Sequence, residues 1–490
     1  MKKKFYITTS IVYTNASPHI GFTLELTQSD AIARYRRQKG ESVFFLTGAD
    51  EHGQKIYETA KKSGKSPKRF VNQISAEIRE LTKLISISND DFIRTTDQKR
   101  HWPSVFKLWK KMAQKGDIYK KKYQGLYCVG CERFYLKKEL VNNSCPIHLT
   151  KPELIEEENY FFRLSKYSKI IEKKIKSNEL KIVPEIRRNE MLSLLKSGLE
   201  DISFSRPKEK LPWGIPVPGD NSQIIYVWGD ALTNYISGVG YGNKKESALF
   251  KKYWPANAHV IGKDILRFHA GIWPGMLMSA GVKLPKMILV HGFITYGGHK
   301  MSKSLGNVVS PFELIKKYGS EATRYYLLRE IPTLDDGDYT KEKMISRYNA
   351  DLAKGLGNFS ARILTLGSKV KISLIYYKNK KNIDSNVKKQ IEKTKKIYDR
   401  KFSEFKINEA VGSVWDLISF GDRYINNKKP WENTESKIKI ILNLLFLLEA
   451  VGDLILPFLP KTSQKILKNI NKSGKNLKIT RGENLFPRLD

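Results

Sequence analysis

The chain has 490 residues, and its 87 Lys and Arg outnumber its 50 Asp and Glu, which gives a formal net charge of +37. This length excludes a single small hydrophobic core and predicts two to four packed units. The odd number of cysteines excludes a closed disulfide framework and favours a reducing, cytoplasmic setting. The charge favours a polyanionic partner such as a nucleic acid, although a biased genome composition explains a lysine excess equally well.

The first fifty residues predict a strand, a helix and a second strand. The first strand ends near Val12, the helix covers 22–38 and ends before Gly40, and the second strand covers 43–46. This βαβ pattern is typical of a parallel sheet. Because the chain runs directly into the first strand, we expect no signal or transit segment.

The middle of the chain predicts an interruption of that sheet. Helical patterns fill 53–112, and short, turn-rich pieces over 120–150 indicate an inserted module. Strand-like segments then return, so we expect the parallel sheet to resume after the insertion. These segments cover 224–228, 259–261 and 287–290.

The last third of the chain predicts an all-α domain. Apolar residues recur there at helical spacing, beginning with Leu352, Leu356, Phe359, Ile363 and Leu366. The Lys- and Asn-rich stretch 368–384 is expected to be an exposed connector. The apolar stretch 438–459 is long enough to span a bilayer, but Lys439 and Asp453 within it favour a buried bundle helix.

The first candidate site is the sequence Pro-His-Ile-Gly over 18–21, where the first strand turns into the first helix. Backbone N–H groups and the positive helix end face a bound phosphate at such a turn. His19 adds a hydrogen-bond donor, and Gly21 lets a nucleotide approach the backbone closely. A histidine at a strand end is more often structural when it stands alone, so this interpretation needs a second element.

A lysine loop provides that element. It consists of Lys300, Met301, Ser302, Lys303 and Ser304. Flanking glycines and a predicted capped helix start at Ser310 place it between ordered elements. Two lysines on such a loop can bind phosphates while a carboxylate attacks an α-phosphate and pyrophosphate leaves. The alternative, a solvated surface turn, is disfavoured by the pairing with His19.

The cysteines form a candidate metal site. Cys128 and Cys131, thirteen residues, and then Cys145 and His148 supply three thiolates and one imidazole at ligand spacing. Four protein ligands leave no open position for water, so we predict one structural zinc ion. The alternative is three reduced thiols and an unrelated histidine.

Together these motifs resemble those of the class I aminoacyl-tRNA synthetases, in the form of a methionyl-tRNA synthetase with a single zinc knuckle. The resemblance covers essentially the whole chain. It also rests on 6–9 (Tyr-Ile-Thr-Thr), 45–53 (Phe-Leu-Thr-Gly-Ala-Asp-Glu-His-Gly), 226–235 (Tyr-Val-Trp-Gly-Asp-Ala-Leu-Thr-Asn-Tyr) and 259–265 (His-Val-Ile-Gly-Lys-Asp-Ile). It implies that ATP, with Mg²⁺, activates L-methionine to methionyl-adenylate and pyrophosphate. Methionine then passes to the 3′-terminal adenosine of tRNA(Met), which yields AMP and supplies translation initiation and elongation.

The resemblance implies an α/β fold with a Rossmann-like parallel-sheet catalytic domain, a zinc-knuckle insertion and an all-α anticodon-binding bundle. The implied division is 1–115 for the first catalytic half, 116–223 for the insertion, 224–290 for the second half, 291–345 for a stem-contact region with the lysine loop, and 346–490 for the helical domain. No dimerising module is expected after the helical domain, so we expect a monomer.

The implied ATP site contains His19, Gly21, Phe22, Lys300, Ser302, Lys303 and Ser304. One departure from the family is plain, because its first signature usually ends in a second histidine and Phe22 stands there. Phe22 either packs beside the adenine or fills the helix start. The reaction assignment rests on His19 and the lysine loop.

The implied methionine pocket consists of Ile11, Tyr13, Asp50, Trp228, Ala231, Leu232, Tyr235, Asp264, Ile265 and His269. Aromatic faces suit a polarizable thioether, and Asp50 is placed to accept the substrate ammonium. Ile265 and His269 are spaced i, i+4 on one expected helix, and Tyr13 or His269 is a candidate for a weak bond to sulfur. For any one of these residues, ordinary core packing is the alternative.

In the helical domain, the resemblance assigns Asn358, Arg362 and Trp431 to recognition of a CAU anticodon. Asn358 and Arg362 are spaced i, i+4, and an exposed Trp431 can stack on an unpaired base. The alternatives are an arginine in a helix salt bridge and a core tryptophan. Another class I enzyme is a rival, but the insertion is too short for a large editing domain. A tRNA-binding protein without catalysis is a second rival, which only Phe22 favours.

Overall fold

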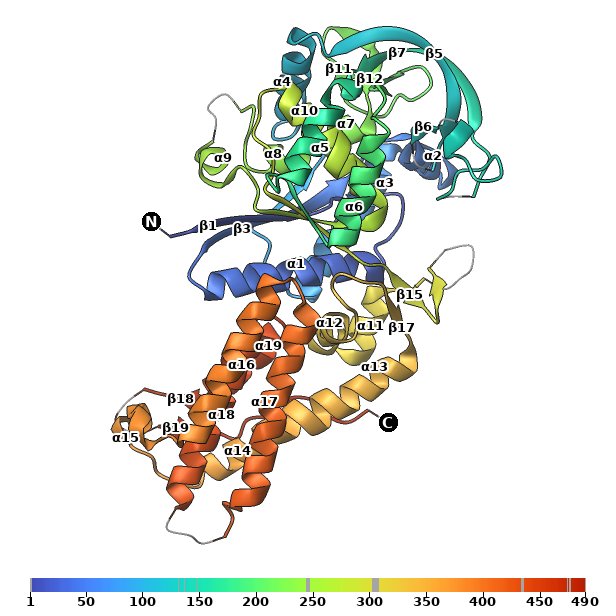
Figure 1. Cartoon of the computed structure of the whole chain (residues 1–490). Helices are drawn as coiled ribbons and strands as arrows, with labels where there is room; N and C mark the ends of the chain where they lie inside the picture. The colour runs from blue at the N-terminus through green and yellow to red at the C-terminus, as the bar shows by residue number, and fades with distance from the viewer. Residues whose placement is uncertain are drawn as a thin grey trace. The chain divides into compact units, whose positions relative to one another are not determined.

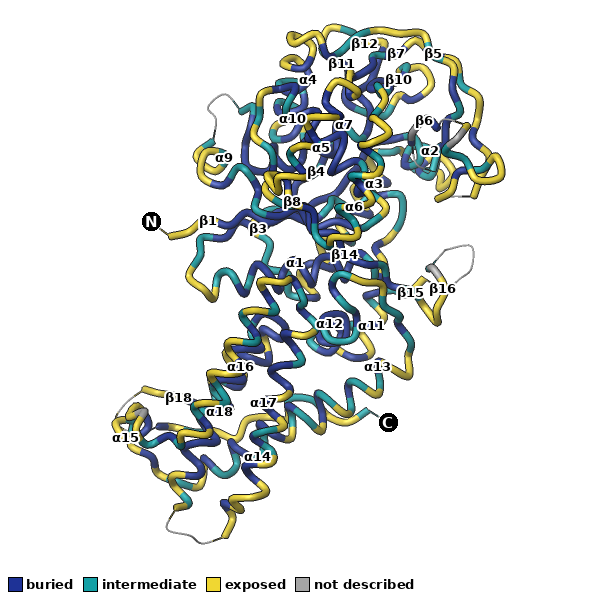
Figure 2. Tube along the Cα trace, in the orientation of Figure 1, coloured by how far each residue is buried: buried dark blue, intermediate teal, exposed yellow. Residues whose placement is uncertain are grey.

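The computed structural model describes residues 2–130, 132–135, 137–147, 149–243, 247–301, 308–432, 436–473, 475 and 477–489 (Figures 1 and 2). The chain forms two compact units. The first, called the sheet unit, comprises Met1–Pro18, Gly40–Thr82 and Ser88–His291. The second, called the helical unit, comprises His19–Lys39, Lys83–Ile87 and Gly292–Asp490.

The sheet unit is built on a parallel sheet with the strand order β2-β3-β1-β13-β14-β8, and β4 pairs with β3. Figure 2 shows the central strands in the colour of buried residues. Near-continuous apolar runs, such as the one in β3, are typical of parallel strands that are covered on both faces. The strands are β1 (Lys4–Thr9), β2 (Val12–Tyr13), β3 (Ser42–Asp50), β4 (Asp91–Arg94), β8 (Lys181–Val183), β13 (Ala258–Gly262) and β14 (Met287–His291).

Two sequence predictions about this sheet are wrong. The segment 224–228 does not contribute a parallel strand, because β12 (Asp220–Ile225) lies between β10 (Ser205–Pro207) and β11 (Pro216–Val217) in an antiparallel sheet. Residues from Val227 onward are helical. An apolar run predicts a strand but does not specify its partner, so the pattern could not distinguish the two sheets.

The second error concerns β8, which pairs in parallel with β14 although it lies within the predicted insertion 116–223. Strand β8 has only 3 residues, too few to show a period. Similarly, β4 interrupts the helical interval predicted over 53–112. The parallel sheet therefore draws one strand from a segment that the sequence assigned elsewhere.

The insertion contains an antiparallel sheet with the order β6-β5-β7-β9. Its strands are β5 (Ile118–Cys128), β6 (Arg133–Tyr135), β7 (Glu153–Phe162) and β9 (Ile202–Ser203). Cys128 is the last residue of β5. The helices of the sheet unit are α2 (Gln54–Lys62), α3 (Pro67–Leu84), α4 (Trp102–Gln114), α5 (Ser168–Lys176), α6 (Glu185–Lys196), α7 (Val227–Ala231), α8 (Asn234–Ser237), α9 (Ala248–Tyr253) and α10 (Trp273–Ser279).

The helical unit contains α1 and the chain after β14. A small sheet in the order β16-β15-β17 precedes a helical bundle, and a two-stranded hairpin of β18 and β19 is the exception to the predicted all-α pattern. These strands are β15 (Ile294–Tyr296), β16 (His299–Lys300), β17 (Gly337–Tyr339), β18 (Ile470–Asn471) and β19 (Lys478–Ile479). The helices are α1 (Ile20–Gln38), α11 (Pro311–Tyr318), α12 (Ser320–Arg329), α13 (Lys341–Arg347), α14 (Asn358–Gly367), α15 (Leu374–Lys378), α16 (Ser385–Ser403), α17 (Ile407–Lys428), α18 (Lys437–Ile455) and α19 (Pro460–Lys468), with a π-helix over Tyr348–Gly357.

The predicted apolar stripe of the helical unit is confirmed, because Leu352, Leu356, Phe359 and Ile363 are buried, and Leu366 is half-buried. Helix α18 is also largely buried. No helix within the described residues is both long and apolar enough to cross a bilayer. The stretch 368–384 is only partly an exposed connector, since it contains α15.

Helix α1 lies within the predicted first catalytic half, 1–115, but belongs to the helical unit. Its Asp30 accepts a hydrogen bond of 2.7 Å from Nη2 of the fully buried Arg324 on α12. The Nε of Arg324 donates to the carbonyl of Phe458, at 2.9 Å. A buried guanidinium with these partners joins α1 to α12 and to the end of the α18 segment.

Candidate active site

A buried carboxylate marks the end of β3. Asp50 is 7% exposed, and its neighbour across the strand pair is Tyr13 on β2. Within the described residues, Oδ1 of Asp50 is buried without a hydrogen-bond partner. Burial, and then the charges of Asp230 and Glu132, raise the pKa of Asp50 well above its ordinary value. A carboxylate in this environment is suited to accept a cationic group from a ligand.

Tyr13 is held by Glu132, which comes from the insertion. The Tyr13 hydroxyl donates to Oε1 of Glu132 at 2.6 Å, and the backbone N–H of Lys55 donates to the same oxygen at 2.9 Å. Burial, and then the charge of Glu132, raise the pKa of Tyr13 well above its ordinary value, so the phenol stays protonated. Gly53 leaves the necessary space, because an added Cβ there would lie 2.4 Å from the Tyr13 hydroxyl.

Sequence reasoning missed Glu132. Its side chain is 5% exposed, and its backbone is left-handed with φ 51°. A glutamate that follows a cysteine in a turn-rich segment is typical of a solvated surface residue, so the burial of Glu132 could not be predicted from the sequence. No periodic pattern spans the sequence between it and Tyr13, so the pairing appears only in the fold.

The side chains of Tyr235 and His269 are joined by a hydrogen bond. The carbonyl of Ile265 can only accept, so His269 donates to it through Nδ1, at 3.0 Å. Nε2 is then an acceptor, and the Tyr235 hydroxyl donates to it at 2.7 Å. Burial lowers the pKa of His269 to about 4, so the ring is neutral near pH 7.

This arrangement leaves His269 without an N–H for a ligand sulfur, which contradicts the suggestion that its side chain bonds a thioether. The predicted regular helix is also wrong. Lys263–Ile265 forms a 3₁₀ turn and Phe268–Ile272 a π-helix. These two rings therefore offer a ligand contact area and polarizability rather than a hydrogen-bond donor.

Trp228 adds a further aromatic ring beside His269. Trp228 stacks on Phe268 with a centroid distance of 3.8 Å, and its ring centroid lies 6.4 Å from that of His269. Leu232 and Tyr235 belong to one buried cluster, against which Tyr13, Trp228 and Ile265 pack.

Helix α7, which carries Trp228, is positioned by a buried carboxylate. Asp230 accepts from Nδ1 of His52 and from Nε2 of His101, both at 2.7 Å, and Nδ1 of His101 contacts the Ser237 hydroxyl at 2.8 Å. Burial acts to raise the pKa of Asp230, but His52 and His101 outweigh it and hold that pKa below its usual value. His52 follows two residues after Asp50, so this network joins the end of β3 to α7.

The residues predicted to bind ATP belong to the helical unit. His19 is exposed and caps α1, with Nδ1 accepting from the N–H of Gly21 at 3.0 Å. The ring proton is therefore on Nε2. A Cβ at Gly21 would come within 2.8 Å of this ring, which explains the glycine. Phe22 is only 7% exposed, which favours its role in filling the helix start.

The lysine loop is fixed at both ends. Its first end leaves the β15–β16 hairpin, where Gly297 and Gly298 have φ values of 56° and 80° and Asp338 accepts from the N–H of Gly298 at 2.8 Å. At its second end, the N–H of Ile20 donates to the carbonyl of Val309 at 3.1 Å, which places the loop end beside His19. The predicted cap is confirmed, because the Ser310 hydroxyl accepts from the N–H of Glu313 on α11.

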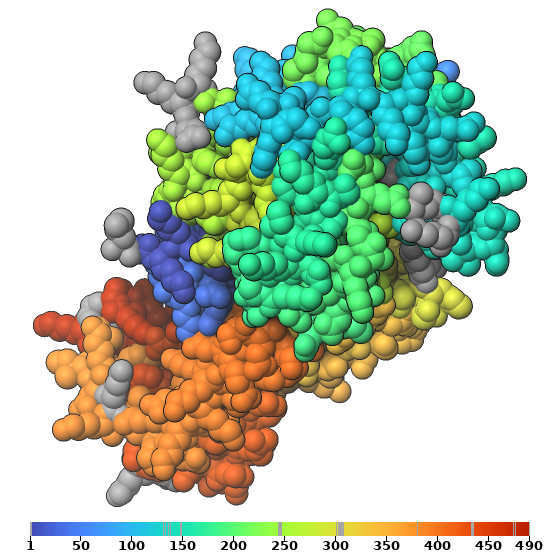
Figure 3. All heavy atoms as spheres, turned by 45° about the horizontal axis from the view of Figure 1, so that its top comes forward, coloured from blue at the N-terminus to red at the C-terminus, as the bar shows by residue number. Residues whose placement is uncertain are grey.

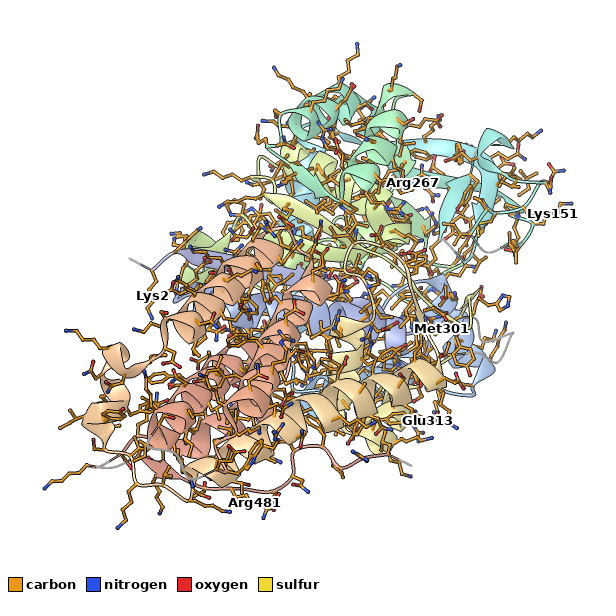
Figure 4. The ribbon with its side chains drawn as sticks, turned by 60° about the horizontal axis from the view of Figure 1, so that its bottom comes forward. Lys2, Lys151, Arg267, Met301, Glu313 and Arg481 are labelled. Carbon is orange, nitrogen blue, oxygen red and sulfur yellow. The ribbon has the colours of Figure 1, made fainter. Side chains whose placement is uncertain are left out.

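The central loop positions Ser302, Lys303 and Ser304, and the side chain of Lys300, lie outside the described residues. Met301 and Glu313, both labelled in Figure 4, belong to the described residues on the two sides of this gap.

The candidate metal site is partly described. Cys128 and Cys145 are buried in one cluster with Tyr135, and the Cys145 sulfur lies 3.4 Å from the Tyr135 hydroxyl. Cys131 and His148 lie outside the described residues. The described residues alone contain no group of three or more metal-ligating side chains, as expected when two of the four predicted ligands fall outside them.

The predicted anticodon residues lie in two places of the helical unit. Asn358 is exposed at the start of α14, and Arg362 lies one turn later. Arg362 contacts Asp422 at 3.4 Å and Asn426 at 2.9 Å, both on α17, so it takes part in the ion pair that was its alternative interpretation. Trp431 is 54% exposed, which excludes the interpretation of a core tryptophan.

A family model described as "tRNA synthetases class I (M)" matches residues 5–149 and 135–364. The methionine–tRNA ligase of Clostridium perfringens is 43% identical to this chain, over 100% of the chain and 78% of the relative. The methionine–tRNA ligase of Thermotoga maritima is 40% identical, over 99% of the chain and 80% of the relative. The chain belongs to the methionine–tRNA ligases of class I.

A solved structure of Mycobacterium tuberculosis methionyl-tRNA synthetase in complex with methionyl-adenylate agrees with this membership. It matches the fold with a TM-score of 0.92 at 35% identity, over 99% of this chain and 100% of that chain. The predicted fold class, a parallel-sheet α/β region with a helical C-terminal region, is thereby confirmed. Membership among the methionine–tRNA ligases also decides against the branched-chain and cysteine enzymes.

Within this methionine–tRNA ligase, the structure brings together most of the predicted methionine pocket. These residues are Tyr13, Asp50, Trp228, Leu232, Tyr235, Ile265 and His269. Ile11 instead packs against a separate cluster that contains Leu46 and Ile93, and Ala231 is buried on α7. Asp264 is exposed, and no contact of its side chain links it to the pocket within the described residues.

Proposed function

We propose that this chain activates L-methionine with ATP and then transfers it to the 3′-terminal adenosine of tRNA(Met). One observation carries the choice of amino acid, namely the buried Asp50 oxygen without a partner in a region where the hydroxyls of Tyr13 and Tyr235 already donate to Glu132 and His269. The ammonium of an α-amino acid would supply the missing cation. A thioether is bound through contact area rather than through hydrogen-bond donors, and the aromatic side chains supply that area.

The carboxylate of the bound methionine attacks the α-phosphorus of ATP, and the bond from that phosphorus to the leaving pyrophosphate breaks. His19 donates through Nε2 to a phosphate oxygen, because Nδ1 is occupied by the N–H of Gly21. Lys300 and Lys303 add positive charge, while Ser302 and Ser304 offer hydroxyl donors from the same loop. Mg²⁺ would neutralise charge on the phosphates. In the second step, the terminal ribose hydroxyl attacks the acyl carbon and AMP leaves.

The assay that tests this function is pyrophosphate exchange into ATP with a panel of amino acids. We expect exchange with methionine and none of comparable rate with leucine, isoleucine, valine or cysteine. Exchange with another member of the panel would identify a different substrate. The absence of exchange with every amino acid would favour a tRNA-binding protein without catalysis. Loss of exchange in His19→Ala would support the role of that ring.

We also propose one structural zinc ion, held by Cys128, Cys131, Cys145 and His148. The described part of the site supports this, because two thiols are buried together and the Tyr135 hydroxyl can donate to a thiolate at Cys145. Metal analysis should find one zinc per chain, and Cys145→Ser should lose it. A chain with intact cysteines and no zinc would contradict the proposal.

The remaining proposals concern partners and setting. Asn358, Arg362 and Trp431 would read the anticodon of tRNA(Met), and the exposure of Trp431 supports this. The five-part division of the chain remains a proposal, with β8 reassigned to the parallel sheet. The protein is expected to be a cytoplasmic monomer. Gel filtration at the mass of a dimer would contradict the monomer.

A further inference from the structure

Two segments of the helical unit contain no acidic residue. Residues 352–383 and 454–482 each contain seven Lys and Arg and no Asp or Glu. The whole chain has 50 acidic residues among 490, or about one in ten, so segments of this length would ordinarily contain several. A lysine-rich composition adds cations everywhere, but it does not remove carboxylates from two particular segments.

The fold brings these two segments together. The N–H of Leu374 donates to the carbonyl of Lys475 at 2.9 Å, and the N–H of Leu477 donates to the carbonyl of Ile372 at 2.9 Å. Ile372, Tyr377 and Leu477 are buried. Figure 1 shows α15 beside β18 and β19, and the same segments adjoin in the space-filling view of Figure 3.

Exposed lysines cover this junction, which we call the basic corner. Long side chains with nitrogen tips extend outward from this end of the helical unit in Figure 4, which labels Arg481 just after β19. The basic corner is defined by Lys369, Lys371, Lys378, Lys381, Lys475 and Lys478, all of them exposed.

The neighbouring carboxylates do not neutralise the basic corner. Glu449 is bonded to Lys472 and to the Tyr377 hydroxyl. Asp384 pairs with Lys439 at 3.1 Å and accepts from the Tyr424 hydroxyl at 2.8 Å. Within the described part of the chain, none of the six lysines of the basic corner forms an ion pair. Six neighbouring cations without counterions repel one another, and a polyanion would relieve that repulsion.

The basic corner also contains groups that suit a nucleic acid rather than a simple anion. Ile375 is 84% exposed and Tyr376 is 37% exposed, and both lie on α15 among the lysines. A tyrosine ring beside cations can stack on a base or pack on a ribose. Several exposed lysines on adjoining segments suit the repeated charges of a phosphate backbone.

Along the sequence, the basic corner begins directly after α14, the proposed anticodon helix. Helix α14 begins at Asn358 and ends at Gly367, and Lys369 comes two residues later. Ten residues of helix correspond to roughly 15 Å, which is the distance of a few phosphates along an RNA strand. One RNA molecule can therefore reach both places.

We propose that the basic corner binds the phosphate backbone of the tRNA outside its anticodon. The inference rests on the proposed function, because it takes tRNA as the substrate. It adds a second contact surface, formed by the residues of α15 and the β18–β19 hairpin, to the base-reading residues of α14.

The test compares two variants with the same change of charge. The first replaces Lys369, Lys371, Lys378 and Lys475 with Gln. The matched control replaces Lys389, Lys393, Lys395 and Lys396 with Gln, since these lysines are equally exposed on α16, where Glu392 lies among them. Binding of tRNA(Met) is measured by fluorescence anisotropy over a salt series.

For the basic-corner variant we expect binding weaker by about tenfold at low salt, and a salt slope smaller by about 2 to 4. The control should change binding by less than about twofold. Equal losses in the two variants would assign the effect to net charge and overturn the proposal. Unchanged tRNA binding and an unchanged salt slope in the basic-corner variant would also overturn it. So would binding of the parent chain to anionic lipid vesicles that is as tight as its binding to tRNA(Met) and is lost in the basic-corner variant.

Failure of the proposed function can be distinguished from failure of this inference. Methionine-dependent pyrophosphate exchange needs no tRNA, so both variants should retain the rate of the parent chain. Loss of that exchange in the parent chain would contradict the proposed function, but the tRNA binding of the two variants could still be compared. Thermal melting of both variants checks that each is folded.

Discussion

Two sets of charged side chains in this protein differ in their surroundings. In the sheet unit, Asp230 lies buried between two histidines, and the buried Glu51 accepts from Arg94 at 2.6 Å. In the helical unit, the lysines of the basic corner are exposed and form no ion pair within the described residues. A contact between buried, desolvated charges is strong and changes little with salt. Exposed charges each contribute little, act on a partner collectively and are screened by salt. The first arrangement suits a small zwitterion, and the second a polyanion.

The largest effect is expected at Asp50, which tests the buried side of this comparison. Asp50→Asn removes the only charge proposed to meet the methionine ammonium. We expect the KM for methionine to rise about 100-fold in pyrophosphate exchange, with little change in the KM for ATP. This loss should be the same at low and high salt. Asp416→Asn, an exposed carboxylate on α17, is the matched control.

The same substitution should make the unliganded protein more stable. Burial raises the pKa of Asp50 above its ordinary value, so the folded state binds this proton more tightly than the unfolded state. The stability that this proton supplies is present at low pH and is lost as pH rises through the folded-state pKa. Above the unfolded-state pKa this buried carboxyl therefore lowers stability in a way that Asn avoids, and thermal melting near pH 7 should shift upward by roughly 1 to 2 °C. A lower melting temperature would show that the interactions of the carboxylate in the folded state outweigh the cost of burying it.

The second-largest effect on the KM for methionine is expected at Glu132, which lies in the insertion and accepts a hydrogen bond from Tyr13 of the predicted pocket. Glu132→Gln keeps the shape but removes the charge that accepts from Tyr13 and from the N–H of Lys55. We expect about a tenfold rise in the KM for methionine. If Glu132 acts through Tyr13, the double variant with Tyr13→Phe should cost little more than either single variant.

Two controls separate positioning from damage to the insertion. Glu156→Gln changes an exposed carboxylate of β7 and should have no effect on exchange. The zinc content of Glu132→Gln should equal that of the parent chain. Additive effects of Glu132→Gln and Tyr13→Phe would show that the two residues act independently.

The case of Glu132 shows where sequence reasoning ended. The sequence predicted the βαβ start, the resumption of the sheet at 259–261 and 287–290, and the capped helix start at Ser310, because each depends on local periodicity or capping. The family resemblance also assigns Asp50 and Tyr235 to a methionine pocket, which stays a prediction. Contacts between distant segments have no periodic signature, so the hydrogen bond between Tyr13 and Glu132 could not be predicted.

The same reason explains the errors in the sheet. Strand β8 is too short to show alternation, and the apolar run before Trp228 has the composition of a strand in either kind of sheet. The role suggested for His269 was wrong because the tautomer depends on the carbonyl of Ile265, whose position follows from the 3₁₀ turn and the π-helix. Composition predicts a polar group but not which of its atoms is already bonded.

A third prediction concerns Trp431, an exposed residue of the helical unit whose proposed contact with RNA involves no charge. Trp431→Ala should raise the KM for tRNA(Met) in aminoacylation by about tenfold, because stacking of a base on an aromatic ring contributes about 1 to 3 kcal/mol. Exchange without tRNA should not change. Stacking involves no counterion, so the effect should persist at high salt, where the effect of the basic corner fades. Ile438→Ala, which is 46% exposed in the parent chain, is the control for a lost apolar surface.

The smallest effect is expected at Phe22, where the family signature usually has a second histidine. The ring of Phe22 is 7% exposed, while His19, three residues earlier, is exposed and holds its proton on Nε2. A histidine at 22 would enter a buried environment and lose apolar contact, so Phe22→His should lower the melting temperature. Its exchange rate should stay within about threefold of the parent rate, because a buried ring adds no donor for the phosphates, whereas a true second donor contributes far more. Phe22→Leu keeps the position apolar and isolates the loss of ring volume. A rate that rises more than tenfold in Phe22→His, but not in Phe22→Leu, would show that the position reaches the phosphates and that this chain works without a donor which it could use.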